Sequence, residues 1–156
     1  MPPIVYLSAS IRAQPVMRRY RDILQDEFGW KVQARWIDVQ ESSPMGVKEV
    51  QEDRVRAAIY AVTDMADILT SGTVIIFTRW PSTSGGRHTE LGLALAFGKR
   101  IILVGPRENV FQALPDEQFR NWADFLTHLR SENATTPRNT ENPYPTEDGA
   151  GGAGST

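Results

Sequence analysis

Short apolar runs alternate along this chain with longer segments whose apolar residues recur every three or four positions. The runs at 4–10, 73–80 and 100–106 predict buried strands, and the alternating pattern at 31–38 predicts a strand nearer the sheet edge. Strands that alternate with helices form parallel sheets covered on both faces. The pattern therefore predicts an α/β fold: a flavodoxin-like or Rossmann-like doubly wound parallel sheet of four to five strands in a single domain.

The helical segments are recognised by their ends and their apolar faces. The first lies between Pro15, near its first turn, and Gly29, at the position of a C-cap glycine. A long helix is expected at 47–69, a nearly apolar one at 88–97, and a final amphipathic one after Pro115. The apolar stripe expected on the long helix consists of Val55, Ala58, Ile59, Val62, Ala66 and Leu69.

Composition divides the chain into a folded part and a tail. Residues 1–130 contain all the apolar runs and are expected to form the α/β domain. Residues 131–156 contain no Ile, Leu, Val, Met, Phe or Trp and are rich in Pro, Gly, Thr and Asn. Such a segment cannot bury enough surface to offset its ordering entropy, so a disordered C-terminal tail is predicted.

Charge and residue usage exclude several classes of function. A net charge of −2 and the absence of Lys/Arg runs argue against binding to a nucleic-acid polymer. The chain has no cysteine, and His88 and His128 lack ligand spacing, so neither a metal nor a cofactor is expected. No signal peptide and no membrane-spanning run is recognised, which predicts a soluble cytoplasmic protein that binds no membrane.

The carboxyl ends of the strands should carry the ligand, because doubly wound sheets bind ligands at that edge. Residues 8–14, 79–87 and 106–111 follow three of the predicted strands and would share this edge. Small residues at a helix N-terminus, as in "STSGG" (82–86), form an anion-binding hollow, to which Arg12 would add a forked donor. The alternative is two ordinary loops between strand and helix.

Three acidic residues stand beside this edge. Glu90 is expected in the first helical turn, where unpaired N–H groups favour an ionised carboxylate. A carboxylate at a cleft without metal ligands or cysteine suits glycosidic bond cleavage, whose transition state is cationic. Asp64 and Asp67 share one helix face by their i, i+3 spacing, and one of them could assist a leaving group. The alternative for Glu90 is an ordinary acidic residue that pairs with Arg87. The alternative for Asp64 and Asp67 is a position on a solvated helix face.

Three motifs in this order carry a resemblance: "VYLSASIR", "DMADI" and "SGGRHTELGLALAFGKRIILVG". Together they resemble the nucleoside 2-deoxyribosyltransferase family and its relatives that hydrolyse nucleoside monophosphates, over residues 4–111. The resemblance implies that Glu90 is the nucleophile that attacks C1′, that Asp64 helps the base to leave, and that Tyr6 orients Glu90. Substrate binding is expected at Ser8, Ser10, Ile11, Arg12, Asp67, Trp80, Ser84, Gly85, Gly86 and Asn109. From their aromatic rings, Trp80 and Phe111 could stack on a base or equally serve in packing. The resemblance implies that Asn109 reaches a neighbouring subunit's site.

The leading hypothesis is a transferase that cleaves (deoxy)nucleosides through a glycosyl-Glu intermediate and passes the 2-deoxyribosyl group to another nucleobase. One alternative is a nucleoside 5′-monophosphate N-hydrolase, and another is a non-catalytic nucleotide-binding module. The partners implied are a nucleoside or nucleotide, a nucleobase, and further copies of the chain in a homodimer or larger homo-oligomer with composite sites.

Overall fold

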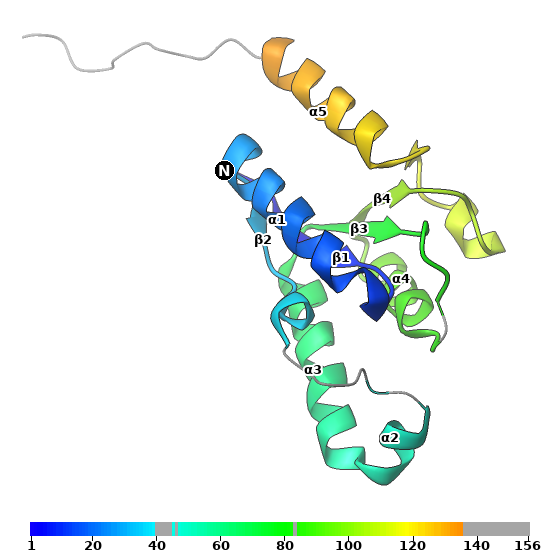
Figure 1. Cartoon of the computed structure of the whole chain (residues 1–156). Coiled ribbons are helices and arrows are strands. Elements are labelled where there is room, and N and C mark those ends of the chain that lie inside the picture. Colours follow the sequence, from blue (N-terminus) through cyan, green and yellow to red (C-terminus); the bar gives the residue numbers. More distant parts are fainter. Residues whose placement is uncertain (40–44, 46, 83, 136–156) are drawn as a thin grey trace, which may run out of the picture.

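The computed structural model describes residues 1–39, 45, 47–82 and 84–135. They contain one parallel sheet of five strands in the order β2-β1-β3-β4-β5, which confirms the predicted doubly wound topology (Figure 1). The strands are β1 (Ile4–Ser8), β2 (Lys31–Val32), β3 (Thr73–Phe77), β4 (Arg100–Val104) and β5 (Glu117–Phe119).

Helices cover both faces of the sheet. The α-helices are α1 (Gln14–Phe28), α2 (Val47–Glu52), α3 (Arg54–Thr70), α4 (Gly86–Ala96) and α5 (Trp122–Thr135). Three short 3₁₀ helices are η1 (Ile11–Ala13), η2 (Arg35–Asp38) and η3 (Val110–Ala113). Tyr20 of α1 and Trp122 of α5 both contact the Phe77 ring, so these two helices share one face. Helices α3 and α4 contact each other on the opposite face.

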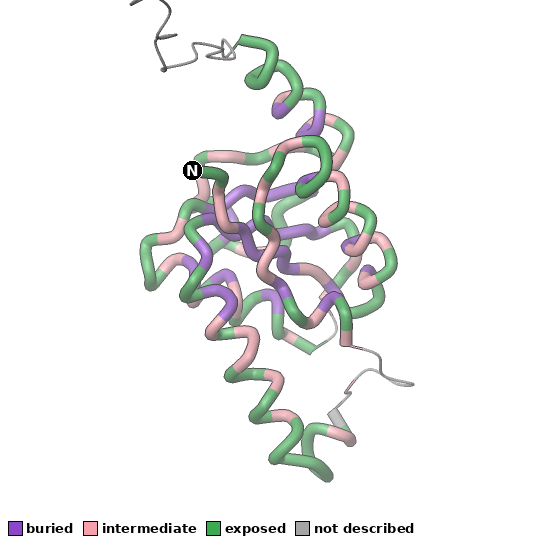
Figure 2. Tube along the Cα trace, turned by 90° about the vertical axis from the view of Figure 1, so that its left-hand side faces the viewer, coloured by how far each residue is buried: buried purple, intermediate pink, exposed green. Residues whose placement is uncertain are grey.

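The sheet centre forms the core, as the buried strands in Figure 2 show. Every residue of β3 is buried, and β1 is buried from Val5 onward. Because side chains alternate between faces along a strand, Tyr6 and Ser8 point to one face and Val5 and Leu7 to the other. The two polar side chains of β1 therefore face α4, where their partner lies.

The strand expected at 31–38 is much shorter in the structure. Pairing with β1 covers only Lys31 and Val32, after which the chain turns into η2. The buried carboxylate of Asp67 accepts hydrogen bonds from the Arg35 backbone N–H and from its Nε, both at 2.9 Å. These bonds hold the chain away from the sheet, so an alternating pattern at the edge gave only a two-residue strand.

The helix expected at 47–69 is two helices, and part of its apolar stripe is exposed. Asp53 separates them and caps α3 by accepting a hydrogen bond from the Arg56 N–H at 3.0 Å. Val55, Ile59 and Val62 are 73%, 58% and 65% exposed. Figure 1 shows α2 and the first half of α3 extending beyond the sheet, which leaves nothing of the described chain to cover this stripe.

The last predicted helix begins later than expected. Residues 117–119 pair with β4 as β5, and α5 starts at Trp122. It continues to Thr135, so residues 131–135 of the predicted tail are helical. The remainder of that tail, 136–156, lies outside the described residues. Among the helices that the structure describes, none is long and apolar enough to cross a bilayer.

Candidate active site

Glu90 of α4 is held by two side chains of β1. The Tyr6 hydroxyl donates a hydrogen bond to Glu90 Oε1 at 2.8 Å, and Ser8 Oγ donates one to Oε2. Tyr6 and Ser8 are fully buried, and Glu90 is half-buried. Both carboxylate oxygens are thus fixed, in an orientation set by the alternation along one strand.

The position and charge of Glu90 differ from the prediction. Gly85 adopts a left-handed conformation (φ 76°), so α4 already begins at Gly86 and Glu90 is its fifth residue. It lies beyond the four N–H groups that a helix leaves unpaired. Burial raises the pKa of Glu90 to about 7, against the lowering effect of the hydrogen bonds from Ser8 and Tyr6. The carboxyl is therefore close to half ionised at neutral pH.

Asp64 of α3 is the second carboxyl of the site. Burial, followed by the charge of Asp67, raises the pKa of Asp64 to about 6, and Arg35 opposes this rise. The charge of Asp64 also raises the pKa of Glu90. Two neighbouring carboxyls that titrate near neutral pH are suited to share the roles of nucleophile and proton donor.

Two adjoining cavities open beside these carboxyls. The smaller, of about 160 Å³, is lined by Ala9, Ser10, Ile11, Trp36, Asp64, Ser82, Ser84, Gly86, Arg87 and Glu90. The larger, of about 300 Å³, is lined by Ile11, Gln14, Trp36, Val39, Met45, Tyr60, Thr63, Asp64 and Ser84. The smaller one is rich in small polar residues, and the larger one has aromatic and aliphatic walls. Their shared residues place Asp64 where the two meet.

Trp36 and Tyr60 were missed by the sequence analysis, although both line the larger cavity. The Trp36 indole N–H donates to the Leu7 carbonyl at 2.8 Å, and Gln14 Nε2 donates to the Trp36 carbonyl at 2.9 Å. These bonds fix Trp36 at the carboxyl end of β1. Its position after the second strand was a usable signal, which was hidden because 31–38 was interpreted as one strand.

The structure brings several predicted residues together around Glu90. Tyr6 and Ser8 contact its carboxylate, and Asp64, Ser10, Ile11, Ser84 and Gly86 line the smaller cavity with it. Gly85 lines neither cavity and serves as the N-cap of α4.

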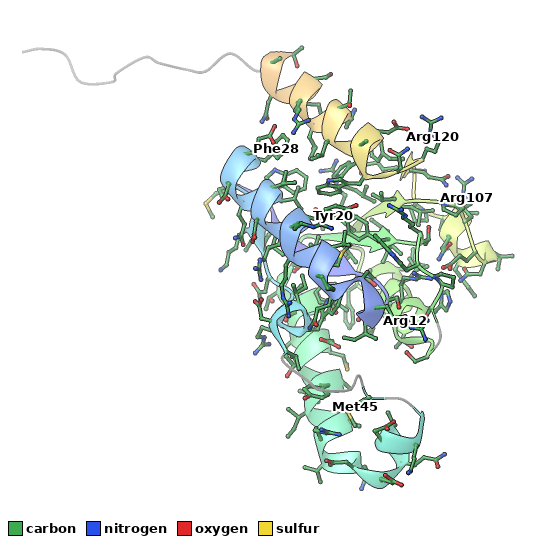
Figure 3. The ribbon with its side chains drawn as sticks, in the orientation of Figure 1. Arg12, Tyr20, Phe28, Met45, Arg107 and Arg120 are labelled. Atoms are coloured by element: carbon green, nitrogen blue, oxygen red, sulfur yellow. The ribbon has the colours of Figure 1, made fainter. Side chains whose placement is uncertain are left out.

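Other predicted residues lie apart from this site. Asp67 is fully buried and bound by Arg35, so it is not on a solvated face, and it lines neither of the two cavities beside Glu90. Trp80 lines a separate cavity on the other face of the sheet. Arg12 is exposed and lines neither site cavity (Figure 3).

Asn109 is also outside the site of its own chain. Its Oδ1 accepts hydrogen bonds from the N–H groups of Phe111 and Gln112, and its Nδ2 lies 3.0 Å from His88 Nδ1. The expectation that Asn109 reaches a neighbouring subunit's site stays a prediction.

Arg87 is a buried arginine whose carboxylate partner is Glu108 rather than Glu90. Its guanidinium also donates to the Phe77 carbonyl at 2.7 Å and to the Trp80 carbonyl. These bonds connect the loop before α4 to the loop after β4. The Nε atom of Arg87 is buried and has no hydrogen-bond partner among the described residues. Among all the residues that the structure describes, no group of three or more acidic, His or Cys side chains is arranged to hold a metal ion.

Comparison with known proteins identifies the fold. No family model matches the chain, and no curated protein matches it. A solved structure of the Clostridium botulinum CMP N-glycosidase BcmB aligns over 81% of this chain and 98% of its own, with 22% identity and a TM-score of 0.51. At the level of its fold, the chain is nucleoside 2-deoxyribosyltransferase-like. A 2-deoxyribosyltransferase from Bacillus psychrosaccharolyticus aligns over 78% of this chain and 89% of its own, with 18% identity and a TM-score of 0.54. The resemblance is thereby confirmed for the fold.

Proposed function

We propose that this 2-deoxyribosyltransferase-like chain cleaves the N-glycosidic bond of (deoxy)nucleosides and transfers the 2-deoxyribosyl group to another nucleobase. The observation that carries the proposal is the Glu90 carboxylate, held by Tyr6 and Ser8 at the wall of a cavity that also contains Asp64. The neighbours described as a CMP N-glycosidase and a 2-deoxyribosyltransferase support this class of reaction.

In the first step, an oxygen of ionised Glu90 bonds to C1′ of the sugar as the bond from C1′ to the base nitrogen breaks. The electron pair of that bond goes to the base, and protonated Asp64 donates a proton or a hydrogen bond to it. In the second step, a nitrogen of another base attacks C1′, its proton passes to the Asp64 carboxylate, and the bond from C1′ to Glu90 breaks to release the carboxylate, so the original anomeric configuration returns.

The two cavities suit the two parts of a nucleoside. The small polar cavity holds Glu90 and would take the sugar, while Trp36 and Tyr60 of the larger cavity would take the planar base. Asp64, shared by both, would then lie near the glycosidic bond.

The alternative function is hydrolysis of a nucleoside 5′-monophosphate, with water as the acceptor. It is favoured by Ser82 and Ser84 at the cavity wall and by the unbonded, buried Nε of Arg87, which are suitable partners for a phosphate. A further alternative is a nucleotide-binding module without turnover, which would bind its ligand equally well after loss of Glu90.

Mass spectrometry of the intact protein tests the covalent step. After mixing with deoxynucleosides, a sugar-sized adduct that maps to Glu90 is expected. Glu90→Ala should lose both the adduct and base release, whereas Glu27→Ala, which removes an exposed carboxylate paired with Arg130, should keep them. Wild-type protein that binds nucleosides but releases no base would refute the catalytic proposal.

Product analysis separates transfer from hydrolysis. A deoxynucleoside and its monophosphate are each incubated with the protein, with and without an acceptor base. A new nucleoside that forms only with acceptor supports transfer. Free base together with sugar phosphate, formed from the monophosphate without acceptor, supports the hydrolase instead.

We also propose that a second copy of the chain covers the apolar stripe of α3. Val55, Ile59 and Val62 form an exposed aliphatic surface, with Arg54 and Thr63 at its border. The stripe continues from the helix that supplies Tyr60 and Asp64, so an identical partner there would adjoin the larger cavity. Light scattering should show a dimer or larger assembly. Ile59→Glu should shift it toward monomer, whereas Leu114→Glu, on a different exposed surface, should not; a wild-type monomer would refute the proposal.

A further inference from the structure

A separate cavity, of about 620 Å³, lies on the face of the sheet opposite Glu90. It is lined by Tyr20, Phe77, Arg79, Trp80, Val104, Gly105, Pro106, Arg120, Asn121, Trp122 and Ala123. No described residue lines both this cavity and the two beside Glu90. The volume lies within the range of about 300–1,000 Å³ that is typical of small-molecule sites.

Aromatic rings form the wall of this cavity. Tyr20 and Trp122 are stacked, with ring centroids 3.9 Å apart and planes at 9°, and the Trp122 ring lies 5.9 Å from that of Phe77. Trp80, Tyr20 and Trp122 are all half-buried, so part of each ring faces the cavity side. Flat, half-exposed rings with fixed orientation provide a surface on which another planar group can stack.

Arginines provide positive charge at the same place. The Arg79 guanidinium lies over the Trp80 ring at 5.3 Å from the centroid and has no carboxylate partner among the described residues. Arg120, just before α5, also lines the cavity, and its contact with Asp124 is an exposed ion pair (Figure 3). A guanidinium that stacks on an aromatic ring keeps its edge free to bind a phosphate or carboxylate in a bidentate manner.

Tyr20, which lines the cavity, lies within the electrostatic influence of Arg79. Burial raises the pKa of the Tyr20 phenol, and the nearby positive charges of Arg79 and Arg19 oppose that rise. The Tyr20 hydroxyl makes no hydrogen bond with the described residues, which leaves a donor next to the arginines. Aromatic wall, free hydroxyl and guanidinium groups thus converge from α1, from the loop after β3 and from the start of α5.

We propose that this cavity is a second binding site, which takes a small anion that carries a planar ring, such as an aromatic phosphate. The ring lies against Trp80 and Trp122, and the anionic group binds Arg79 and Arg120. The backbone carbonyls of Phe77 and Trp80 bind Arg87 on the Glu90 side, so the two sites are separated by this segment of chain. The second site stands whether or not Glu90 is catalytic.

The four tryptophans allow a direct test with phenyl phosphate, which has a ring and a phosphate but no sugar. In ¹⁵N-labelled protein, the indole signals of Trp80 and Trp122 report on this cavity, and the indole signal of Trp36 reports on the Glu90 site. The indole signal of Trp30 reports on the core, because Trp30 packs on Phe28 and Phe125. We expect Trp80 and Trp122 to shift in a saturable manner at concentrations up to about 10 mM, with Trp36 and Trp30 unchanged. Shifts confined to Trp36, or no shift at all, would overturn the proposal.

Variants and simpler probes assign the binding groups. Arg79→Gln should weaken binding roughly tenfold or more, because a charge-assisted bidentate contact is lost. Arg54→Gln removes the same charge at the remote start of α3 and should leave binding unchanged. Inorganic phosphate and phenol should each bind at least about tenfold more weakly than phenyl phosphate. If inorganic phosphate or phenol binds as tightly as phenyl phosphate, the site does not require ring and anion together. If Arg79→Gln and Arg54→Gln weaken binding equally, Arg79 does not bind the anion.

Discussion

Replacing Glu90 by Gln should stabilise the folded protein at alkaline pH. In the folded chain, burial raises the pKa of Glu90 from an ordinary value of 4.5 to about 7. The folded state therefore holds a proton that the unfolded chain has already lost between these two pH values. Because the unfolded state binds fewer protons there, the free energy of unfolding falls as the pH rises from 4.5 to 7.

The magnitude follows from the difference between these two pKa values. Each pKa unit corresponds to about 1.4 kcal/mol, so ionising Glu90 in the folded protein costs about 3 kcal/mol once the pH is above 7. Gln has a similar shape and no charge to desolvate. The free energy of unfolding of Glu90→Gln should therefore equal that of wild type near pH 4.5 and be higher by up to about 3 kcal/mol at pH 8. The variant should nevertheless be inactive.

Urea unfolding at pH 4.5, 6 and 8 measures this difference. Glu27→Gln is a suitable control, because Arg130 lowers the pKa of the Glu27 carboxyl, so this variant should be no more stable than wild type at pH 8. If Glu90→Gln is less stable than wild type at pH 8, hydrogen bonds from Tyr6 and Ser8 outweigh desolvation. The raised pKa of Glu90, and the reasoning built on it, would then be wrong.

Three further predictions concern the carboxyls and their partners. The kcat/KM of wild type should be highest between about pH 6 and pH 7 and fall on either side, because activity needs Glu90 ionised while Asp64 is protonated, and the pKa of Asp64 is about 6 and that of Glu90 about 7; Asp64→Asn should abolish the alkaline limb and lower kcat/KM roughly 100-fold, and an unchanged alkaline limb would exclude Asp64 as the proton donor. Tyr6→Phe removes the 2.8 Å hydrogen bond to Glu90 and so raises the pKa of Glu90; the alkaline limb should move to higher pH and kcat/KM at pH 6 should fall about tenfold, measured by base release; an alkaline limb that stays in place would count against this role. Asp67→Asn should lower the free energy of unfolding by about 2 kcal/mol in urea, because Arg35 loses its charged partner, and should move the acid limb of the pH profile to lower pH, because the charge of Asp67 raises the pKa of Asp64; an acid limb that does not move would contradict this coupling.

Much of the fold followed from local pattern. The runs at 4–10, 73–80 and 100–106 have the apolar density of buried strands, and all three are central strands of the sheet. Gly29 ends α1 in the left-handed conformation (φ 67°), as its position indicated. Errors arose where long-range contacts changed local structure, as at 31–38, which the Asp67–Arg35 pair draws into η2.

The sequence by itself determined the order of the three central strands, and with it the edge of the sheet that the residues after β1, β3 and β4 share. The contact of Tyr6 with Glu90 was implied only by the family resemblance, and the tertiary structure contains it. Periodicity and chain order are local properties, so they can be recognised without coordinates. Only the tertiary structure decided that Glu90 is a carboxyl with a raised pKa, that Arg87 pairs with Glu108, and that the stripe of α3 faces outward. Desolvation and pairing depend on which distant segments exclude water from a side chain, and no pattern along the chain records this.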